Sequence, residues 1–532
     1  MKKIIFLLAF FSILFISCAK RGTITGGPKD TIAPVIVKSN PKNFNTNFTG
    51  NKIRIDFSEY IKVKDINKQL IISPPMEKAP TIIPQGSASK FISITLNEEL
   101  KPNTTYSFNF GQSITDYNEG IPYSQFKYVF STGAYVDSLS ISGTIKDAYE
   151  NKTDEFVSVM LYEANTFNDS LVYKQKPIYV TNTLEKNTNF KIENLKDGEY
   201  YLVALKDKNN NNTFQSKSEK IAFLKEKIKI PSENNYTLKL FSEKSDLKTY
   251  VPTQESNNKL YVGYEGNAKN VSFFTKKNNI ETPLKFTNPE NKKADTLQVF
   301  IPNNAKDSLS VIVKSDNYEK EYMLKLKTLK VSDSLKITLN QLRNTSFSEK
   351  VSLRTTTPIK SINQNKIFLR KKDSSLVPFS TKIIDLEQKI EFDFKPEENE
   401  KYTLQLLPGA LEDDYYIKND SLQFEFSKNQ ISDYGNLKLR FTNIKRFPYV
   451  VEIVNTSGEV IGEKVCTKET EMYFEAIQPS QYTVRLYYDD NGNKTWDTGN
   501  FKLKLQPEEM IYFQGLIDVR ANWDVDQELV LD

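Results

Sequence analysis

The chain has 532 residues, 72 Lys and Arg against 67 Asp and Glu, and no histidine. The formal net charge of +5 is too small and too evenly scattered to indicate a nucleic-acid-binding protein. Without histidine, Ser-His-Asp and Cys-His catalytic arrangements and His-containing metal sites are excluded. Chemistry based on paired carboxylates stays open, but the acidic residues mostly fall in turns and on alternating strand faces. We therefore expect no enzyme.

The first residues have the pattern of an export signal. Two lysines precede an almost unbroken apolar run from Ile4 to Ile16, which is too short to span a bilayer as a mature helix. A small residue then stands directly before Cys18, as in bacterial lipoprotein signals. We predict a lipoprotein signal peptide over residues 1–17 and a lipid anchor on Cys18. The alternative is an ordinary secretory signal with an incidental cysteine.

The mature chain would start with a tether over residues 18–34, because its glycines and prolines disfavour a regular element. Once Cys18 is acylated, Cys466 is the single remaining cysteine, so no intramolecular disulfide can form. The exported protein must then be held by its hydrophobic cores. Cys466 ends an alternating apolar segment, and we interpret it as a small buried residue.

From residue 35 onward the sequence consists of short segments that alternate apolar and polar residues between Asn, Gly, Pro and Asp. Clear examples are Lys52–Phe57, Phe91–Leu96, Tyr106–Phe110 and Gln125–Phe130. This length and period are typical of strands with one buried face, at the spacing of β-sandwiches. Since no long amphipathic helical period follows the signal, we predict an all-β chain, a tandem array of sandwiches.

Two internal repeats define the predicted domains. Residues 53–62 match 351–360 at a shift of 298, which also pairs Phe130 with Lys428, whereas Tyr106 pairs with Tyr402 at a shift of 296. Residues 200–214 match 482–496 at a shift of 282. The predicted domains are 35–134 and 331–430 of one type, 135–245 and 431–532 of a second type, and an unpaired sandwich over 246–330.

Three segments resemble known families. Phe57 to Ile61, Leu100 to Tyr106 and Phe130 to Gly133 resemble the bacterial Ig-like domain of the S-layer type. The repeated Tyr-rich run with its Asn-rich turn resembles prealbumin-like, carboxypeptidase-regulatory-like modules. The segment from Cys18 to Asp30, followed by an Ig-like domain, is similar to a family of Bacteroidota outer-membrane lipoproteins. In the degenerate Ig-like domain 331–430, Thr355 to Pro358 replaces Phe-Ser-Glu-Tyr, so no role of that motif is transferred.

One string resembles a calcium loop. Oxygen-bearing side chains alternate along it, at Asp489, Asn491, Asn493 and Asp497. Calcium takes about six to eight oxygen ligands, and alternate residues around a tight turn can converge on it. Against this, Asn500 stands where an EF-hand has Glu, and Asp207 is the single carboxylate of the earlier copy. The alternative, which we favour, is a type I′ hairpin turn at Asn491-Gly492 without a metal.

A tripeptide of Asp, Ser or Thr, and an aliphatic residue occurs seven times, where composition alone predicts about two. It is similar to the O-glycosylation acceptor of exported Bacteroidota proteins. The candidate acceptors are Thr31, Ser138, Ser170, Thr296, Ser308, Ser334 and Ser421. The alternative is that Asp-Ser marks the starts of strands.

The resemblances imply a non-enzymatic scaffold or accessory subunit of an envelope complex, without cofactor, anchored in the outer membrane and contacting other outer-membrane proteins. A glycan- or ligand-binding lipoprotein of a nutrient-uptake system is the alternative. The acidic residues that usually follow the cysteine of surface-exported lipoproteins are replaced by Ala19-Lys20-Arg21, so the side of the membrane that the domains face stays undecided. Strung end to end, five sandwiches would span on the order of 150 Å.

Overall fold

The computed structural model describes residues 31–531 apart from 269, 290–294, 304–307, 317, 331–332, 341–343 and 346–348. Strands dominate these residues, which confirms the predicted all-β fold of tandem β-sandwiches. Among the residues described, no helix has the length and apolar character needed to cross a membrane. Cys18 and the tether up to Asp30 lie outside the described residues. We call the five sandwiches domains 1 to 5 in chain order.

Domain 1 contains a short helix, α2 (Ile66–Gln69), and the strands β1 (Ile36–Asn40), β2 (Lys52–Val63), β3 (Ile71–Ser73), β4 (Thr81–Ile83), β5 (Ser89–Thr95), β6 (Thr105–Asn109), β7 (Ile114–Asp116) and β8 (Lys127–Ser131). One sheet has the order β1-β2-β5-β4, with β7 also paired to β2, and the other has the order β3-β6-β8. Along β2, Ile53, Ile55 and Phe57 are buried while Arg54 is exposed, the alternation of a strand with one core face.

Domain 4 repeats this topology with β26 (Ile337–Leu339), β27 (Asn344–Thr345), β28 (Val351–Thr355), β29 (Ile359–Ile362), β30 (Ile367–Lys371), β31 (Ser380–Ile384), β32 (Lys389–Asp393), β33 (Lys401–Leu406), β34 (Leu411–Asp413) and β35 (Leu422–Lys428), and the single turns η2 (Gln364–Lys366) and η3 (Asp385–Glu387). Its sheets are β26-β28-β32-β31 and β27-β35-β33-β30. The pair β29-β34 corresponds to β2 with β7 in domain 1.

A tyrosine holds the same place in both copies. The hydroxyls of Tyr106 and Tyr402 each accept a hydrogen bond from the backbone N–H five residues upstream, at 2.9 and 2.7 Å. Each ring stacks on a phenylalanine of the next strand, with centroids 5.4 Å apart for Phe130 and 5.5 Å apart for Phe426. The predicted counterpart of Phe130, Lys428, is therefore wrong, because the tyrosine sets the register and places Phe426 opposite it.

Domain 2 contains α3 (Leu171–Lys174) and the strands β9 (Leu139–Asp147), β10 (Ser158–Glu163), β11 (Tyr179–Asn182), β12 (Asn189–Leu195), β13 (Gly198–Leu205), β14 (Lys220–Phe223), β15 (Ile228–Ile230) and β16 (Asn235–Ser242). Domain 5 contains η4 (Ile431–Asp433), β36 (Gly435–Thr442), β37 (Tyr449–Asn455), β38 (Val460–Cys466), β39 (Glu471–Ile477), β40 (Ser480–Tyr488), β41 (Met510–Tyr512), β42 (Ile517–Val519) and β43 (Asp524–Val530). In each, the first and last strands pair in parallel and the central strand carries the predicted Tyr-rich repeat.

Domain 3 is the unpaired sandwich, with β17 (Lys248–Thr249), β18 (Thr253–Gln254), β19 (Lys259–Glu265), β20 (Ser272–Lys277), β21 (Ile280–Leu284), β22 (Phe286–Thr287), β23 (Thr296–Phe300), β24 (Ser308–Ser315) and β25 (Tyr318–Lys325). It is fastened to domain 4. The Tyr415 hydroxyl donates to the carbonyl oxygens of Asn258 and Ile301 at 3.2 and 3.1 Å. Lys285 forms an ion pair of 3.1 Å with Asp414.

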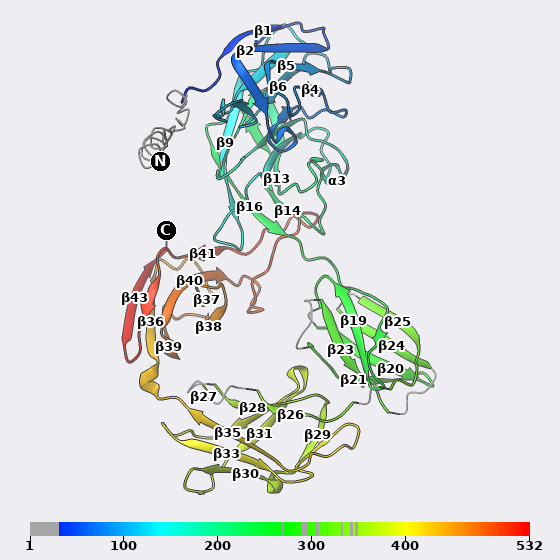
Figure 1. Cartoon of the computed structure of the whole chain (residues 1–532), viewed down its shortest axis with the longest axis vertical. Coiled ribbons are helices and arrows are strands. Elements are labelled where there is room, and N and C mark those ends of the chain that lie inside the picture. Colours follow the sequence, from blue (N-terminus) through cyan, green and yellow to red (C-terminus); the bar gives the residue numbers. More distant parts are fainter. Residues whose placement is uncertain are drawn as a thin grey trace, which may run out of the picture.

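The domains are not strung out. In Figure 1, domain 1 projects from domain 2, and domains 2 to 5 follow one another around a ring that closes where a loop of domain 5 returns to domain 2. We call this loop, residues 498–506, the closing loop. The chain connects the other neighbours in the ring, so the contact between domains 5 and 2 is the one closure that depends on non-covalent packing alone.

Phe501 is the centre of this closure. Its side chain is 1% exposed and joins the domain 2 cluster that contains Phe223 and Phe241. The Phe501 N–H donates to the Glu243 carboxylate at 2.5 Å, and Lys504 forms a 2.5 Å ion pair with Asp169. An aromatic ring buried in another domain's core therefore fastens the two ends of the ring.

We expect the substitution Phe501→Ala to open the ring. Removing a buried Phe side chain costs roughly 3 kcal/mol or more, which is a large share of what one non-covalent junction can supply. Small-angle scattering should show an increased radius of gyration. The control is Leu503→Ala in the same loop, since Leu503 is 64% exposed. Equal radii for the two variants would contradict the role of Phe501.

Candidate functional site

The predicted calcium string lies in the loop that follows β40, and its side chains serve the loop itself. Both carboxylate oxygens of buried Asp489 accept backbone N–H groups, from Asn493 at 3.0 Å and Lys494 at 2.9 Å. The amides of Asn491 and Asn493 donate to the carboxylate of Asp497. The four residues are thus brought together, but the two amides present nitrogen atoms to Asp497.

The structure differs from the expected type I′ hairpin turn at Asn491-Gly492. A type I′ turn needs positive φ at both central residues, and only Gly492 has it here, with φ of 74°. The next strand, β41, starts only at Met510, so the connection is a long loop. Elsewhere in the described part of the chain, too, no group of three His, Cys, Asp or Glu side chains is placed to hold a metal ion.

The loop has the same construction in domains 2 and 5. In domain 2, the carboxylate of Asp207 accepts the N–H groups of Asn209 at 3.1 Å and Asn212 at 2.7 Å. A glutamate closes each loop by accepting two further N–H groups at 2.9 Å, Glu219 in domain 2 and Glu508 in domain 5. In the Asn-rich segment, backbone N–H groups are thus paired with a buried Asp and a buried Glu instead of with a neighbouring strand.

This construction locates an insertion. The two clamping aspartates are 282 positions apart in sequence, whereas the two clamping glutamates are 289 apart, so the loop of domain 5 is seven residues longer. The additional residues fall between Asp497 and Glu508, which is where the closing loop lies. The sequence repeat contained this signal, because the match ends at Trp496.

Burial and hydrogen bonding have opposite effects on the pKa values of the loop's carboxyl groups. Burial raises the pKa of Glu508, and the backbone N–H groups of Asp490 and Asp497 only partly offset it. For Asp497, burial is outweighed by hydrogen bonds from Asn491, Lys244 and Asn493, and its pKa is lowered. Lys244 follows β16, the last strand of domain 2, and its ammonium lies 3.1 Å from Asp497. Asp497 is therefore an ionised anchor between the two domains.

A second contact region of the same junction surrounds Arg485 on β40. Its guanidinium forms an ion pair with buried Glu452 and donates to the hydroxyls of Tyr512 at 3.0 Å and of Tyr149, in domain 2, at 2.9 Å. The Tyr512 hydroxyl in turn donates to the Tyr149 carbonyl at 2.6 Å. A buried cation with an anion and two hydroxyl partners fixes the angle between the domains, because each bond is directional.

The tryptophans contribute little to an open aromatic platform of the kind that glycan binding needs. Trp496 is half-buried in the junction, with its ring centroid 4.8 Å from that of Tyr149 and its N–H donating to the Glu508 carbonyl at 3.0 Å. Trp523 is 57% exposed, and the Arg520 guanidinium lies 5.2 Å from the centre of its ring. Cys466 is buried as predicted, and burial raises the pKa of its thiol.

The candidate glycosylation positions that follow an aspartate are mostly accessible. Six of the seven are exposed, namely Thr31, Ser138, Ser170, Ser308, Ser334 and Ser421, and Thr296 is half-buried. Several also stand where strands begin: Thr296 and Ser308 are the first residues of β23 and β24, and Ser138 and Ser421 directly precede β9 and β35. Both interpretations of the tripeptide are thus compatible with the positions.

Comparison with known proteins identifies domain 1. Residues 30–132 match the bacterial Ig-like domain family, so domain 1 is a bacterial Ig-like domain. No curated protein matches the chain. Among solved structures, it is similar to the major pilin subunit BcpA of Bacillus cereus at 10% identity, covering 74% of this chain and 99% of that one, with a TM-score of 0.15. It is also similar to domains 1–6 of the surface layer protein SbsC at 12% identity, covering 88% and 67%, with a TM-score of 0.14.

We expect the Asp489→Ala and Asp207→Ala substitutions to destabilise their domains equally, by roughly 1–3 kcal/mol each, because both leave buried N–H groups without an acceptor. Thermal unfolding of the full chain measures the effect. Calcium should neither bind the unmodified protein in a calorimetric titration nor raise its melting temperature. Heat of binding that disappears in Asp489→Ala but persists in Asp207→Ala would instead establish a calcium site in domain 5.

Proposed function

We propose that the chain is a non-enzymatic, lipid-anchored scaffold subunit of an outer-membrane protein complex, one that serves the assembly of β-barrel proteins. The observation that carries this proposal is the ring closure. A spacer or stalk is expected to be extended. Here an inserted loop instead holds domain 5 against domain 2, which shortens the molecule. Fixed mutual orientation of several sandwiches is what a subunit needs in order to contact other subunits at several points.

The chemistry of the junction supports the same function. Its buried contacts are the Phe501 ring and the Arg485 guanidinium, which is paired with Glu452 and donates to the Tyr149 hydroxyl of domain 2. The Lys504–Asp169 and Lys244–Asp497 ion pairs are partly exposed and are the part of the junction that salt would screen. The buried contacts should therefore keep the geometry of the junction at varying ionic strength, as a protein outside the cytoplasm requires. Attachment through Cys18 would hold the frame at the membrane, where weak contacts with a partner become strong through effective concentration.

Depletion of the protein should lower the amounts of β-barrel proteins in the outer membrane, and native gels should show it in a larger complex. Complementation with Phe501→Ala should fail while complementation with Leu503→Ala succeeds, because only the former opens the frame. Protease treatment of intact cells would show which side of the membrane the domains face. Normal barrel levels, with the protein migrating alone and retained on a polysaccharide matrix, would favour the glycan-binding alternative.

We also propose that the exposed Asp-Ser and Asp-Thr positions carry O-linked glycans. Their support is the excess of the tripeptide together with the exposure of six acceptor hydroxyls. The intact mass of the protein from its native host should exceed the mass of the acylated polypeptide, and Ser170→Ala should remove one glycan increment. Thr296, half-buried in a paired strand, should carry the least modification. A mass equal to that of the acylated chain would rule the modification out.

A further inference from the structure

Domains 1 and 4 have the same topology, but the end at which the chain enters has different neighbours in each. In domain 1 the chain arrives beside the middle of β2: the Val35 N–H donates to the Ser58 hydroxyl at 3.1 Å, and the Ser58 N–H donates to the Val35 carbonyl at 2.8 Å. Next along β2, the Tyr117 N–H donates to the Tyr60 carbonyl at 3.0 Å. We call this region, formed by Val35, Val37, Tyr60, Lys90 and Tyr117, the upstream end of domain 1.

In domain 4 the corresponding end is covered by the domain that precedes it. The loop after β34 corresponds to the loop after β7, and its Tyr415 is only 9% exposed because its hydroxyl reaches two carbonyls of domain 3. Just before β26, Asp333 forms a 3.0 Å ion pair with Lys259 of domain 3. The upstream end of domain 4 therefore contacts the domain that comes before it in the chain.

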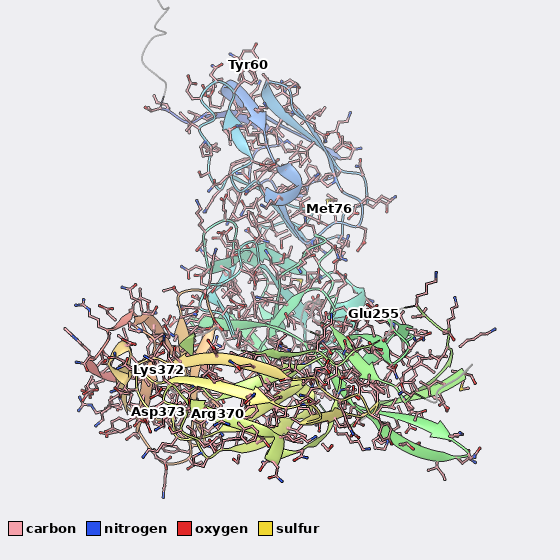
Figure 2. All side chains as sticks on the ribbon, turned by 60° about the horizontal axis from the view of Figure 1, so that its bottom comes forward. Tyr60, Met76, Glu255, Arg370, Lys372 and Asp373 are labelled. Atoms are coloured by element: carbon pink, nitrogen blue, oxygen red, sulfur yellow. The ribbon has the colours of Figure 1, made fainter. Side chains whose placement is uncertain are left out.

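In domain 1 the same end is open. Tyr117 is 49% exposed, Val35 54%, Tyr60 55% and Val37 66%. Figure 2 places Tyr60 at the extremity of the molecule, beyond Met76, which is on the side of domain 1 that faces domain 2, and far from Arg370 and Lys372 of domain 4. Two large rings and two aliphatic side chains thus face outward at the tip that the chain enters.

What precedes domain 1 is the tether and its anchor. From Cys18 to Thr31 the chain can reach at most about 45 Å even when fully extended. The membrane that holds the anchor would therefore always lie within a short distance of the upstream end. Since the upstream end of domain 4 contacts what precedes it in the chain, we expect the upstream end of domain 1 to contact the membrane.

The side chains suit a lipid headgroup region. Tyrosine rings are amphipathic and are enriched at membrane–water interfaces, and lysine can extend its ammonium towards phosphate. The Lys90 ammonium lies 5.2 Å from the centre of the Tyr60 ring. Glu59 precedes Tyr60 and Glu119 follows Tyr117 by two residues, so Lys90 gives this end no excess of positive charge. Its attraction to lipid should therefore depend on the rings and aliphatic groups.

We propose that the upstream end of domain 1 docks on the lipid headgroup region of the membrane in which the Cys18 acyl chains are inserted. This inference rests on the lipid anchor of the proposed function. Docking would fix the orientation of the ring of domains relative to the membrane, instead of leaving the protein to rotate freely about its tether.

The test uses the acylated full chain in phosphatidylcholine vesicles. A spin label is attached at Asn118→Cys, an exposed position beside Tyr117, while Cys466 stays unreactive because it is buried. The control label is attached at Tyr416→Cys in the corresponding loop of domain 4, where Tyr416 is 70% exposed. We expect the ratio of oxygen to nickel accessibility to be several-fold higher at position 118 than at position 416.

Replacing both rings, by Tyr60→Ser and Tyr117→Ser, should return the label at position 118 to the value of the control while the protein still floats with the vesicles. A label at position 118 that is as accessible to nickel as the control in the unmodified tip would overturn membrane docking. Shielding that appears only in the native envelope would overturn it in favour of a protein partner. If the protein does not float at all, the anchor itself is refuted, and the inference with it.

Discussion

The insertion of Phe501 into the core of domain 2 is the contact on which the arrangement of the whole chain depends. Each sandwich has its own hydrophobic core. Their relative positions depend on contacts between domains, because a single chain crossing by itself leaves several angles open. Closing the chain on itself removes most of that freedom at once. Burial of the Phe501 ring stabilises the contact, and the directional hydrogen bonds of Arg485 set its orientation.

The duplicated pair of domains shows how one architecture can give two geometries. Domain 1 rests the outer face of its β3-β6-β8 sheet on domain 2, where the Val180 N–H donates to Ser73 and Lys127 pairs with Glu193. The same face of domain 4 carries half-buried Arg370 and exposed Glu425, and it is turned away from such a contact. The residues differ with exposure: the covered face has the small Ser73 and a Lys127 that is paired across the contact, whereas the open face has charged groups that meet water.

Much of the fold was within reach of the sequence, because strand alternation is a local property. The buried positions of β2, the Tyr-rich strands β13 and β40, and the burial of Cys466 all follow from period-two patterns. The Asn-rich loop was less predictable. Its Asn491-Gly492 pair is typical of a two-residue turn. In the structure, Asp489 and Glu508 instead accept the N–H groups of a long loop, and no local sequence pattern relates Glu508 to the Asn-rich segment.

The sequence by itself determined that this is an all-β chain of repeated sandwiches, since hydrophobic period and internal repeats are carried by neighbouring residues. It also determined which segments correspond, down to the tyrosines that set strand register. Only the tertiary structure decided that the sandwiches form a ring and not a string. Phe501 lies in an insertion without regular alternation, and its partners Phe223 and Phe241 are more than 250 residues away. Such a contact depends on shape and burial between distant surfaces, which no local period records.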